Sequence, residues 1–351
     1  GLWLGPYRVA EVAIGDYIVL ERNPEWYGDA PAFERIVVDV IENTAALEAS
    51  LLAGEIDMIA GEMGLPLDQA LAFEARHGDR FTVEYVPGLI YEHLEVNLDN
   101  AIFKDPRVRQ ALLWAIDRAA LTSQLFAGKQ PVAATAVHPL DWVHSEDVPR
   151  YSRDLDRAAA LLDAAGWRPG PDGVRVNEAG ERLSFAFSTT AGNRSRELVQ
   201  QFLQAQWAEV GIEARIRNLP PRVLFAEHLS RRQFTGMAMF AWISAPESPP
   251  KTTLHSTMIP TAENGWSGQN YSGYADPEMD RLIEAIEVEL DREERAALWA
   301  ELQRRYATDL PALPLYFRAN AHIRPAWLEG VRPTGHQDVS TLWVEEWRVR
   351  D

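Results

Sequence analysis

Residues 92–116 read EHLEVNLDNAIFKDPRVRQALLWAI and hold the change of pattern that decides the fold. Glu92 to Asn97 alternate polar and apolar side chains, which is typical of a half-buried strand. Asp105 and Pro106 suit the cap and the first turn of a helix, and apolar residues after them recur at intervals of three and four. We therefore predict a strand over 92–97 and an amphipathic helix that begins after Asp105.

Strands and helices interleave in the same way on both sides of this stretch. The β-branched run at 35–41 predicts a buried strand, and Thr44 and Gly54 suit the start and the end of a helix. Asp154 opens another helix, with Gly166 just beyond its end. This rhythm indicates an α/β fold with mixed sheets and flanking helices. Further elements are a hairpin over 7–20, a helix at 66–76, a helix that carries Leu198, Phe202 and Ala205 on one face and ends at Gly211, and helices after Asp276 and Asp291. Strands are expected at 57–60, 81–85, 185–189, 212–216, 237–242 and 313–317.

Length and charge limit the classes of protein to consider. The chain has 351 residues, and a single hydrophobic core stops growing at roughly 250–300 residues, so two domains or lobes are expected. The hydrophobic share of 46% and the charged share of 25% are ordinary for a soluble globular protein. With 34 basic and 52 acidic side chains the net charge is −18, which excludes a strong nucleic-acid binder because phosphate neutralisation requires an excess of Lys and Arg.

Several kinds of site and segment are also excluded by composition. The sequence has no cysteine, so disulfides, thiolate metal sites and cysteine nucleophiles are ruled out. The longest apolar run, at 237–243, has seven residues and is far shorter than the roughly 20 that span a bilayer. The first residues, GLWLGP, contain neither a basic segment nor a long apolar stretch, so we expect no targeting peptide in this chain.

Motifs of common catalytic and cofactor sites do not occur. The sequence contains neither a GxxxxGK[ST] loop nor a GxGxxG turn, and ATP hydrolysis is therefore not supported. The eight histidines form no HExxH pattern and no pair four residues apart, so no metal site is predicted. Gly265 to Gly268 superficially suggest a serine hydrolase turn, and Ser267 is kept as the nucleophile of a hydrolase alternative.

A candidate binding site lies where a buried strand ends. The strand at 237–242 runs into SAPESPP at 244–250, a segment that cannot continue a strand. Ligands of open α/β sheets favour the crevice outside strand ends, so this junction is a site candidate. Trp242 is either a core residue or a surface on which a ligand stacks. The other candidates here are Ser244 and Glu247, together with Asn270, Tyr271 and, if its strand lines a cleft, His93.

Four segments, in order along nearly the whole chain, carry a resemblance. They are GPYR at 5–8 with LERNPEWYG at 20–28, FKDPRVRQALLWAIDR at 103–118, DLDRAAALLDAAGW at 154–167, and NYSGYADPEMDRLI at 270–283. Together they resemble the family 5 extracellular solute-binding proteins, the peptide and nickel receptors of ABC importers. The resemblance implies a bilobed, type II periplasmic-binding-protein-like fold in which one lobe is inserted into the other.

On this resemblance, lobe I comprises 1–97 and 314–351, and the inserted lobe II comprises 98–313. The family has a long N-terminal portion of lobe I before GPYR, which this chain lacks and which would carry a secretion signal or lipid anchor. In peptide-binding members a carboxylate and a guanidinium hold the ligand termini. Ala245 aligns with that acid, and Glu247 is the nearest substitute. Arg194 and Arg196 are the candidate guanidinium groups, the alternative being that they are solvated residues at a helix start.

The resemblance implies a substrate-binding subunit of an ABC importer that captures a di- or oligopeptide by closing its lobes. Such a subunit performs no catalysis, needs no cofactor, and delivers its ligand to a membrane permease. We expect a monomer in the periplasm or at the cell surface. The alternatives are a receptor of the same family for a nickel chelate, haem or an oligosaccharide, and, from another class, the hydrolase built on Ser267.

Overall fold

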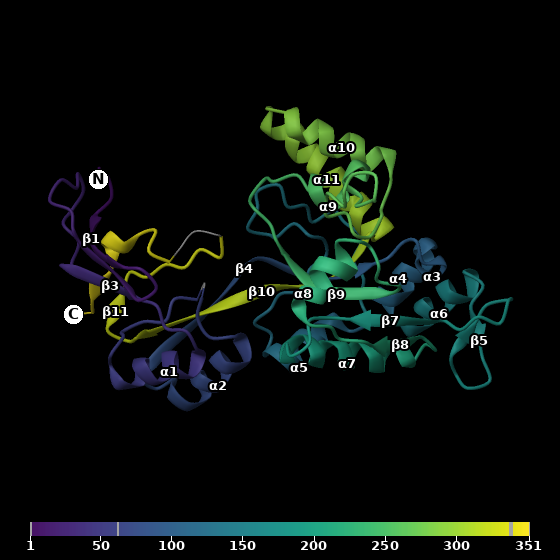
Figure 1. Cartoon of the computed structure of the whole chain (residues 1–351), viewed down its shortest axis with the longest axis horizontal. Helices are drawn as coiled ribbons and strands as arrows, with labels where there is room; N and C mark the ends of the chain where they lie inside the picture. The colour runs from purple at the N-terminus through teal and green to yellow at the C-terminus, as the bar shows by residue number, and fades with distance from the viewer. Residues whose placement is uncertain (1, 62, 337–339, 351) are drawn as a thin grey trace. The chain divides into compact units, whose positions relative to one another are not determined.

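The computed structural model describes residues 2–61, 63–336 and 340–350, and the chain divides into two compact units. Unit 1 comprises residues 1–88 and 319–351, and unit 2 comprises residues 89–318. The chain passes between the units within two long strands, β4 (Phe81–Val96) and β10 (Ala312–Pro325) (Figure 1). The division therefore falls at 88/89 and 318/319. The sequence analysis placed the lobe boundaries at 97/98 and 313/314.

The length of β4 corrects one prediction. Residues 81–85 and 92–97 were expected to be separate strands, but Phe81–Val96 form one strand that runs through Pro87 and Gly88. At Gly88 a Cβ atom would lie 2.8 Å from the carbonyl oxygen of Gly335, so the close approach of the two backbones requires glycine. The Pro-Gly pair within β4 is a point of close backbone packing.

Unit 1 contains a small antiparallel sheet and a pair of helices. The sheet has the order β1 (Tyr7–Ala13), β2 (Tyr17–Arg22), β3 (Arg35–Asp39). The strand expected at 57–60 is reduced to one bridge between Ile59 and Ile323. Leu51, Phe73 and these two isoleucines share one buried cluster. The other elements are α1 (Thr44–Ala53), α2 (Leu67–His77), the pair β11 (Leu328–Glu329) and β12 (Arg348–Val349), and a 3₁₀ turn at Val344–Glu346.

Unit 2 is built on a mixed sheet whose order is β10-β4-β9-β7-β8. Strand β9 (Met237–Ile243) is antiparallel to β4 and parallel to β7 (Ser184–Ser188), and β7 is parallel to β8 (Glu213–Ile216). The predicted α/β class with mixed sheets is thereby confirmed. In the β4–β9 register, Tyr91 lies opposite Trp242 and His93 opposite Phe240, so these four side chains share one face of the sheet.

The helices of unit 2 begin where their capping residues predict. Asp105, Asp154 and Asp276 each accept a hydrogen bond from a backbone N–H of the first turn that follows, and such a cap stabilises a helix by about 1 kcal/mol. The helices are α3 (Ala101–Lys104), α4 (Pro106–Trp114), α5 (Arg118–Phe126), α6 (Leu155–Ala164), α7 (Arg194–Ala208), α8 (Pro221–Val223), α9 (Lys251–Leu254), α10 (Pro277–Val288) and α11 (Arg292–Asp309). Short pieces are β5 (Arg168–Pro169), β6 (Arg175–Val176), a π-helical turn at Leu224–Leu229 and a 3₁₀ turn at Ser256–Met258.

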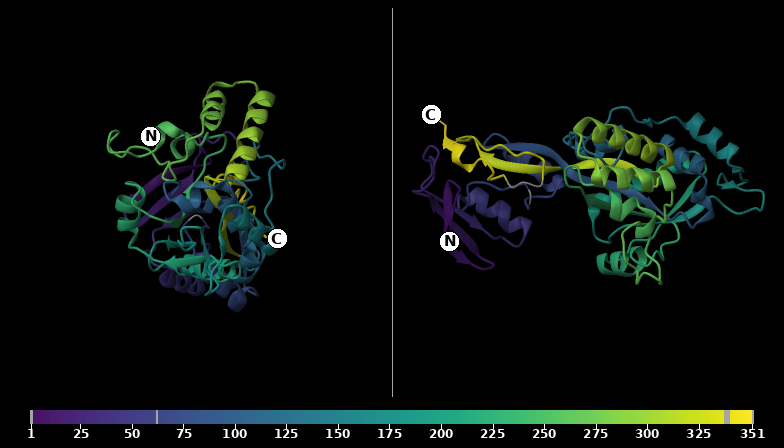
Figure 2. Two further views of the ribbon diagram at one scale, coloured as in Figure 1. Left: turned by 90° about the vertical axis from the view of Figure 1, so that its right-hand side faces the viewer. Right: turned by 90° about the horizontal axis from the view of Figure 1, so that it is seen from above.

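Two groups of buried side chains hold these elements together. Trp207 of α7 is fully buried against Phe185 and Phe187 of β7, with ring centroids 5.9 and 5.6 Å apart. Helices α10 and α11 lie side by side and share a second cluster that includes Leu282 and Leu302 (Figure 2). None of the helices in the described ranges has the length and apolar character that crossing a bilayer requires.

Candidate functional site

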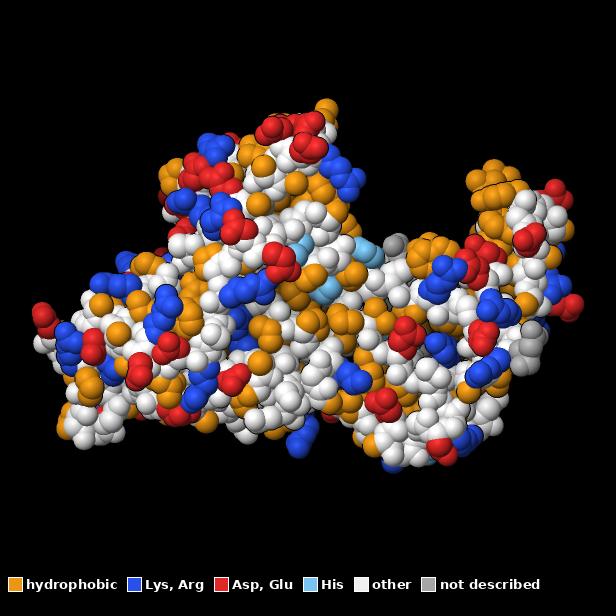
Figure 3. Space-filling model, turned by 180° about the vertical axis from the view of Figure 1, so that it is seen from behind, with side chains coloured by type: hydrophobic (Ala, Val, Ile, Leu, Met, Phe, Trp, Pro, Cys, Tyr) orange, Lys and Arg blue, Asp and Glu red, His pale blue; other side chains and the backbone are white. Residues whose placement is uncertain are grey.

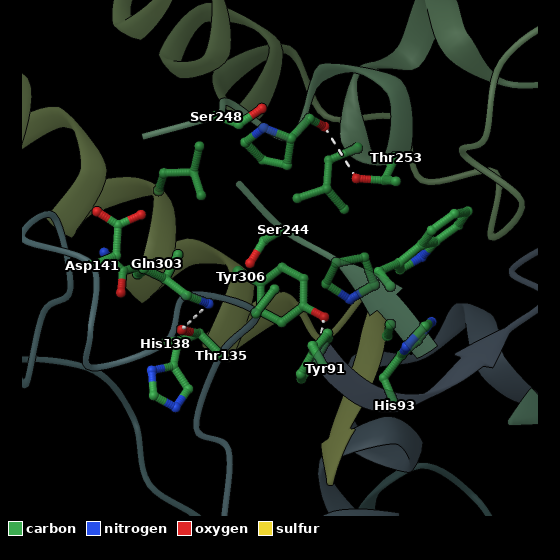
Figure 4. A pocket seen from close by; sticks show the side chains of 18 of the residues that line it. Tyr91, His93, Thr135, His138, Asp141, Ser244, Ser248, Thr253, Gln303 and Tyr306 are labelled. Carbon is green, nitrogen blue, oxygen red and sulfur yellow. Dashed lines mark hydrogen bonds between the residues drawn. The ribbon is translucent and has the colours of Figure 1, made fainter. Parts of the chain in front are cut away.

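A pocket lies within unit 2, on the face of the sheet that carries Tyr91, His93 and Trp242 (Figure 4). Its walls come from β4, β9, the loop at 135–141, the segment at 244–254 and α11. The space that a water-sized molecule can reach is about 90 Å³. That volume holds several waters, or one side chain of a larger ligand, because a single water needs roughly 10–15 Å³ on this measure.

One wall of the pocket is a stack of aromatic rings. The rings of Tyr91 and His93 are stacked with centroids 5.2 Å apart and an interplanar angle of 10°. His93 and Trp242 continue the stack at 6.4 Å and 14°, and Trp242 stacks on Tyr271 at 5.9 Å. The alternation of β4 brings Tyr91 and His93 to one face, and the register with β9 sets Trp242 beside them. The stacked rings of Tyr91, His93 and Trp242 form an aromatic side of the pocket.

Two tyrosines meet at the pocket. The hydroxyl oxygens of Tyr91 and Tyr306 lie 3.0 Å apart and are hydrogen bonded, which joins β4 to α11 (Figure 4). Burial raises the pKa of Tyr91 well above its ordinary value, and the hydrogen-bonded Tyr306 raises it further. Burial also raises the pKa of Tyr306, so both phenols are neutral at physiological pH and Tyr91 is not poised as a base.

Two carboxylates also line the pocket. Glu95 lies near His93, with Oε2 3.1 Å from Nε2, and the two residues are 5% and 1% exposed. Asp141 accepts hydrogen bonds from the backbone N–H groups of Glu247, at 2.9 Å, and Val143, at 3.3 Å. Asp141 thus holds the segment that follows β9 in place, while Glu95 contributes a buried carboxylate next to the aromatic wall.

The predicted site residues are distributed over several environments. His93, Trp242 and Ser244 line the pocket, while Tyr271 packs against Trp242. Asn270 is fully buried, and its amide donates to the carbonyl oxygens of His255 and Tyr274, at 3.1 and 2.8 Å, which is a structural arrangement.

The charged candidates lie outside the pocket lining. Glu247 faces Arg295, with 3.8 Å between Oε2 and Nε, and its side chain is 45% exposed. Arg194, at the first turn of α7, is exposed to solvent. Arg196, in the same turn, is buried and bonded to Glu92.

Arg196 belongs to a buried cluster on the other face of β4. Glu92 is 1% exposed and accepts hydrogen bonds from Nη2 of Arg196 at 3.0 Å and from Nε of Arg318 at 2.8 Å. Nη1 of Arg196 also donates to the hydroxyl of Thr190. Burial raises the pKa of Glu92, but Arg318 and Arg196 lower it by more, so the pKa lies below its ordinary value. The cluster joins β4, α7 and β10.

The sequence analysis did not identify Glu95, Asp141 or Tyr306 as pocket residues. Glu95 could have been found, because a strand places residues 93 and 95 on one face. Asp141 and Tyr306 carry no such local signal, since a loop and a distant helix bring them to the pocket. Ser267 lies in an exposed turn away from the pocket lining, with its backbone N–H bonded to Asn264.

Among the residues that the structure describes, no three histidine, aspartate or glutamate side chains gather as ligands for a metal ion. The surface face in Figure 3 shows acidic and basic side chains interspersed rather than gathered by sign.

Comparison with known proteins identifies the family. A sequence model described as bacterial extracellular solute-binding proteins, family 5 Middle, matches residues 2–263. The chain is 28% identical over 347 residues to the oligopeptide-binding protein AppA of Bacillus subtilis (strain 168), with 98% of this chain and 61% of that protein covered. It is 25% identical over 316 residues to the nickel-binding periplasmic protein of Escherichia coli (strain K12), with 89% and 59% covered.

Solved structures agree with the sequence match. The crystal structure of an oligopeptide-binding protein from Thermus thermophilus, complexed with a pentapeptide, has a TM-score of 0.72 and 34% identity, and covers 93% of this chain and 59% of that one. The chain spans about three fifths of the length of these relatives. The resemblance and the bilobed fold class that the sequence predicted are confirmed. The protein belongs to the family 5 bacterial extracellular solute-binding proteins.

Proposed function

We propose that this chain is the substrate-binding component of an ABC importer, and that its ligand is a di- or oligopeptide. The observation that carries the proposal is the pocket of unit 2, where an aromatic wall and a few polar groups meet at the end of β9 in a chain of solute-binding ancestry. Ligand sites are mostly apolar cavities with a small number of placed polar groups, and this pocket has that composition.

The relatives favour a peptide over other solutes. AppA of Bacillus subtilis is described as an oligopeptide-binding protein, and the Thermus thermophilus protein holds a pentapeptide. A reachable volume of about 90 Å³ suits one side chain, so a peptide would place one residue here and extend beyond the pocket. Extended peptides bind through main-chain hydrogen bonds, with pockets that select individual side chains.

The two compact units are proposed to be the two lobes, with β4 and β10 as the segments about which they close. A ligand shifts such an equilibrium only through its preference for the closed state. The closed protein would then deliver the ligand to a membrane permease, and the receptor would act as a monomer in the periplasm or at the cell surface. The protein itself would leave the ligand chemically unchanged.

Isothermal titration of the purified chain with tri- and pentapeptides tests the proposal. We expect saturable binding in the micromolar range or tighter, weakened about tenfold or more by Trp242→Ala because the aromatic wall is lost. Trp327→Ala is the matched control, since Trp327 is partly exposed in unit 1. Binding of nickel chelates, haem or oligosaccharides without a response to peptides would contradict the peptide assignment and support a non-peptide receptor.

A further inference from the structure

The charges that line the pocket are unbalanced. Among its described lining residues are the carboxylates Glu95 and Asp141, but no lysine and no arginine. The remaining titratable side chains in the lining are two histidines and two tyrosines, all of them buried. A buried carboxylate is unfavourable unless a hydrogen bond or a positive charge compensates it. The two carboxylates differ in how far the protein itself supplies that compensation.

Strand β4 provides an internal comparison between two glutamates. Glu92, on one face, is bonded to both Arg196 and Arg318. Glu95, on the opposite face, has His93 as its one ion-pair partner among the described residues, at 3.1 Å. Asp141 differs again, because two backbone N–H groups already bond its oxygens. Neither carboxylate has a lysine or arginine partner among the described residues, but Asp141 is compensated by two backbone N–H groups, whereas Glu95, which is 5% exposed, has only His93.

The surroundings of Glu95 suit a positive charge. The aromatic wall beside it is formed by Tyr91, His93 and Trp242, and aromatic faces attract ammonium and guanidinium groups. Burial raises the pKa of Tyr271, which stacks on Trp242, and the negative charge of Glu95 raises it further. The charge of Glu95 thus acts on Tyr271, the ring on which Trp242 of the pocket stacks.

We propose that the pocket binds a positively charged group of the ligand, with Glu95 as its counter-ion and the rings of Tyr91 and Trp242 as its walls. His93 holds Oε2 of Glu95, which leaves Oε1 to accept a hydrogen bond from the ligand. This inference rests on the proposed peptide-binding function and specifies its ligand class. The ammonium or guanidinium belongs to a lysine or arginine side chain of the peptide.

Two matched tripeptides test the inference by isothermal titration. Ala-Lys-Ala and Ala-norleucine-Ala share their backbone, termini and side-chain stem, and differ in the ammonium group. We expect wild-type protein to bind Ala-Lys-Ala about tenfold or more tightly, because a charge-assisted bond forms in a site removed from water. Glu95→Gln should abolish this ratio while leaving the affinity for Ala-norleucine-Ala nearly unchanged. Glu178→Gln, which removes an exposed carboxylate from the same unit, should keep the ratio.

N-acetylated forms of both tripeptides identify the source of the charge. If the N-terminus occupies the pocket, acetylation weakens binding tenfold or more in wild type but has little effect in Glu95→Gln, and the lysine and norleucine peptides bind alike. If the side chain occupies it, acetylation leaves the lysine preference intact. The second result supports the inference, and the first overturns the assignment of the pocket to a side chain. Glu95→Asp is a second variant for the case that Glu95→Gln fails to fold, and its withdrawn carboxylate should reduce the preference.

Other outcomes overturn the inference in distinguishable ways. Equal binding of all four peptides by wild type, or a cation preference that persists in both Glu95 variants, refutes the role of Glu95 and leaves the peptide-binding function standing. If none of the peptides binds to wild-type protein, the peptide-binding function fails and this inference fails with it.

Discussion

The guanidinium of Arg196 donates to the carboxylate of Glu92 across 104 residues of sequence, with 3.0 Å between Nη2 and Oε1. Arg318 binds the same carboxylate from β10, and Glu92 is almost completely buried. The first turn of α7 is thereby tied to the two strands in which the chain passes between its units. We take this cluster to fix the geometry of β4, whose other face carries the pocket residues.

Replacement of Glu92 by glutamine should destabilise the protein strongly. The variant removes the carboxylate that two guanidinium groups share, and breaking a buried ion pair typically costs ~3–5 kcal/mol. Equilibrium unfolding in urea measures how far the free energy of unfolding of Glu92→Gln falls below that of wild type. Glu178→Gln is the control and should leave the midpoint where it is, because Glu178 is exposed. A midpoint for Glu92→Gln equal to that of wild type would show that the cluster is not stabilising.

The same cluster predicts a dependence of stability on acid. Because the pKa of Glu92 is lowered in the folded protein from its ordinary 4.5, the unfolded chain binds its proton at a higher pH than the folded protein does. The contribution of Glu92 is therefore complete above pH 4.5 and is lost as the pH falls from there through the folded pKa. Urea unfolding at a series of pH values between about 6 and 3, in wild type and in Glu92→Gln, should show a flatter profile for the variant. Parallel profiles would contradict this assignment.

The bond between Tyr91 and Tyr306 can be measured by a double-mutant cycle. Tyr91→Phe and Tyr306→Phe each remove one hydroxyl and leave the other without its partner, and a neutral hydrogen bond contributes about 1 kcal/mol. We expect the free energies of unfolding to be non-additive by roughly that amount. If the two losses simply add, the hydroxyls do not stabilise each other in solution.

The start of α10 combines a helix cap with an ion pair. Asp276 accepts a hydrogen bond from the backbone N–H of Met279, and Arg305 donates to both of its oxygens at 2.6 Å. Asp276→Ala should lower the free energy of unfolding by about 1–2 kcal/mol because it removes the cap. Asp276→Asn retains a capping oxygen without the charge and should fall between wild type and Asp276→Ala. Equal losses for the two variants would assign the whole effect to the ion pair.

Local patterns predicted much of unit 2 correctly. The helices after Asp105, Asp154 and Asp276 begin at these capping residues, because a cap and its first turn involve only neighbouring residues. The strands at 57–60 and 81–97 were predicted less well. At 57–60 a single bridge to Ile323 replaces the strand, since that segment pairs with a residue far along the chain. Between the two strands predicted at 81–85 and 92–97 the chain stays extended as one strand, and at Gly88 it packs closely against the backbone of Gly335.

The candidate site shows the same limit. The sequence predicted that a strand ends near Trp242 and that an irregular segment follows. Trp242, His93 and Ser244, all candidates from the sequence, line the pocket. The sequence around Arg196 did not indicate that its guanidinium bonds to Glu92 rather than remaining solvated, because Glu92 is 104 residues away. Tyr306 is 215 residues from Tyr91 and likewise had no local signal.

The sequence by itself determined the α/β class, the starts of the principal helices and, through its four motifs, the family. These properties depend on spacing between near neighbours, which the order of residues specifies directly. Only the tertiary structure decided that Glu92 is neutralised by two arginines while Glu95, three residues later, faces an aromatic pocket without one. The electrostatic environment of a buried charge depends on which distant elements pack against it, and that is settled only when strands pair and helices dock.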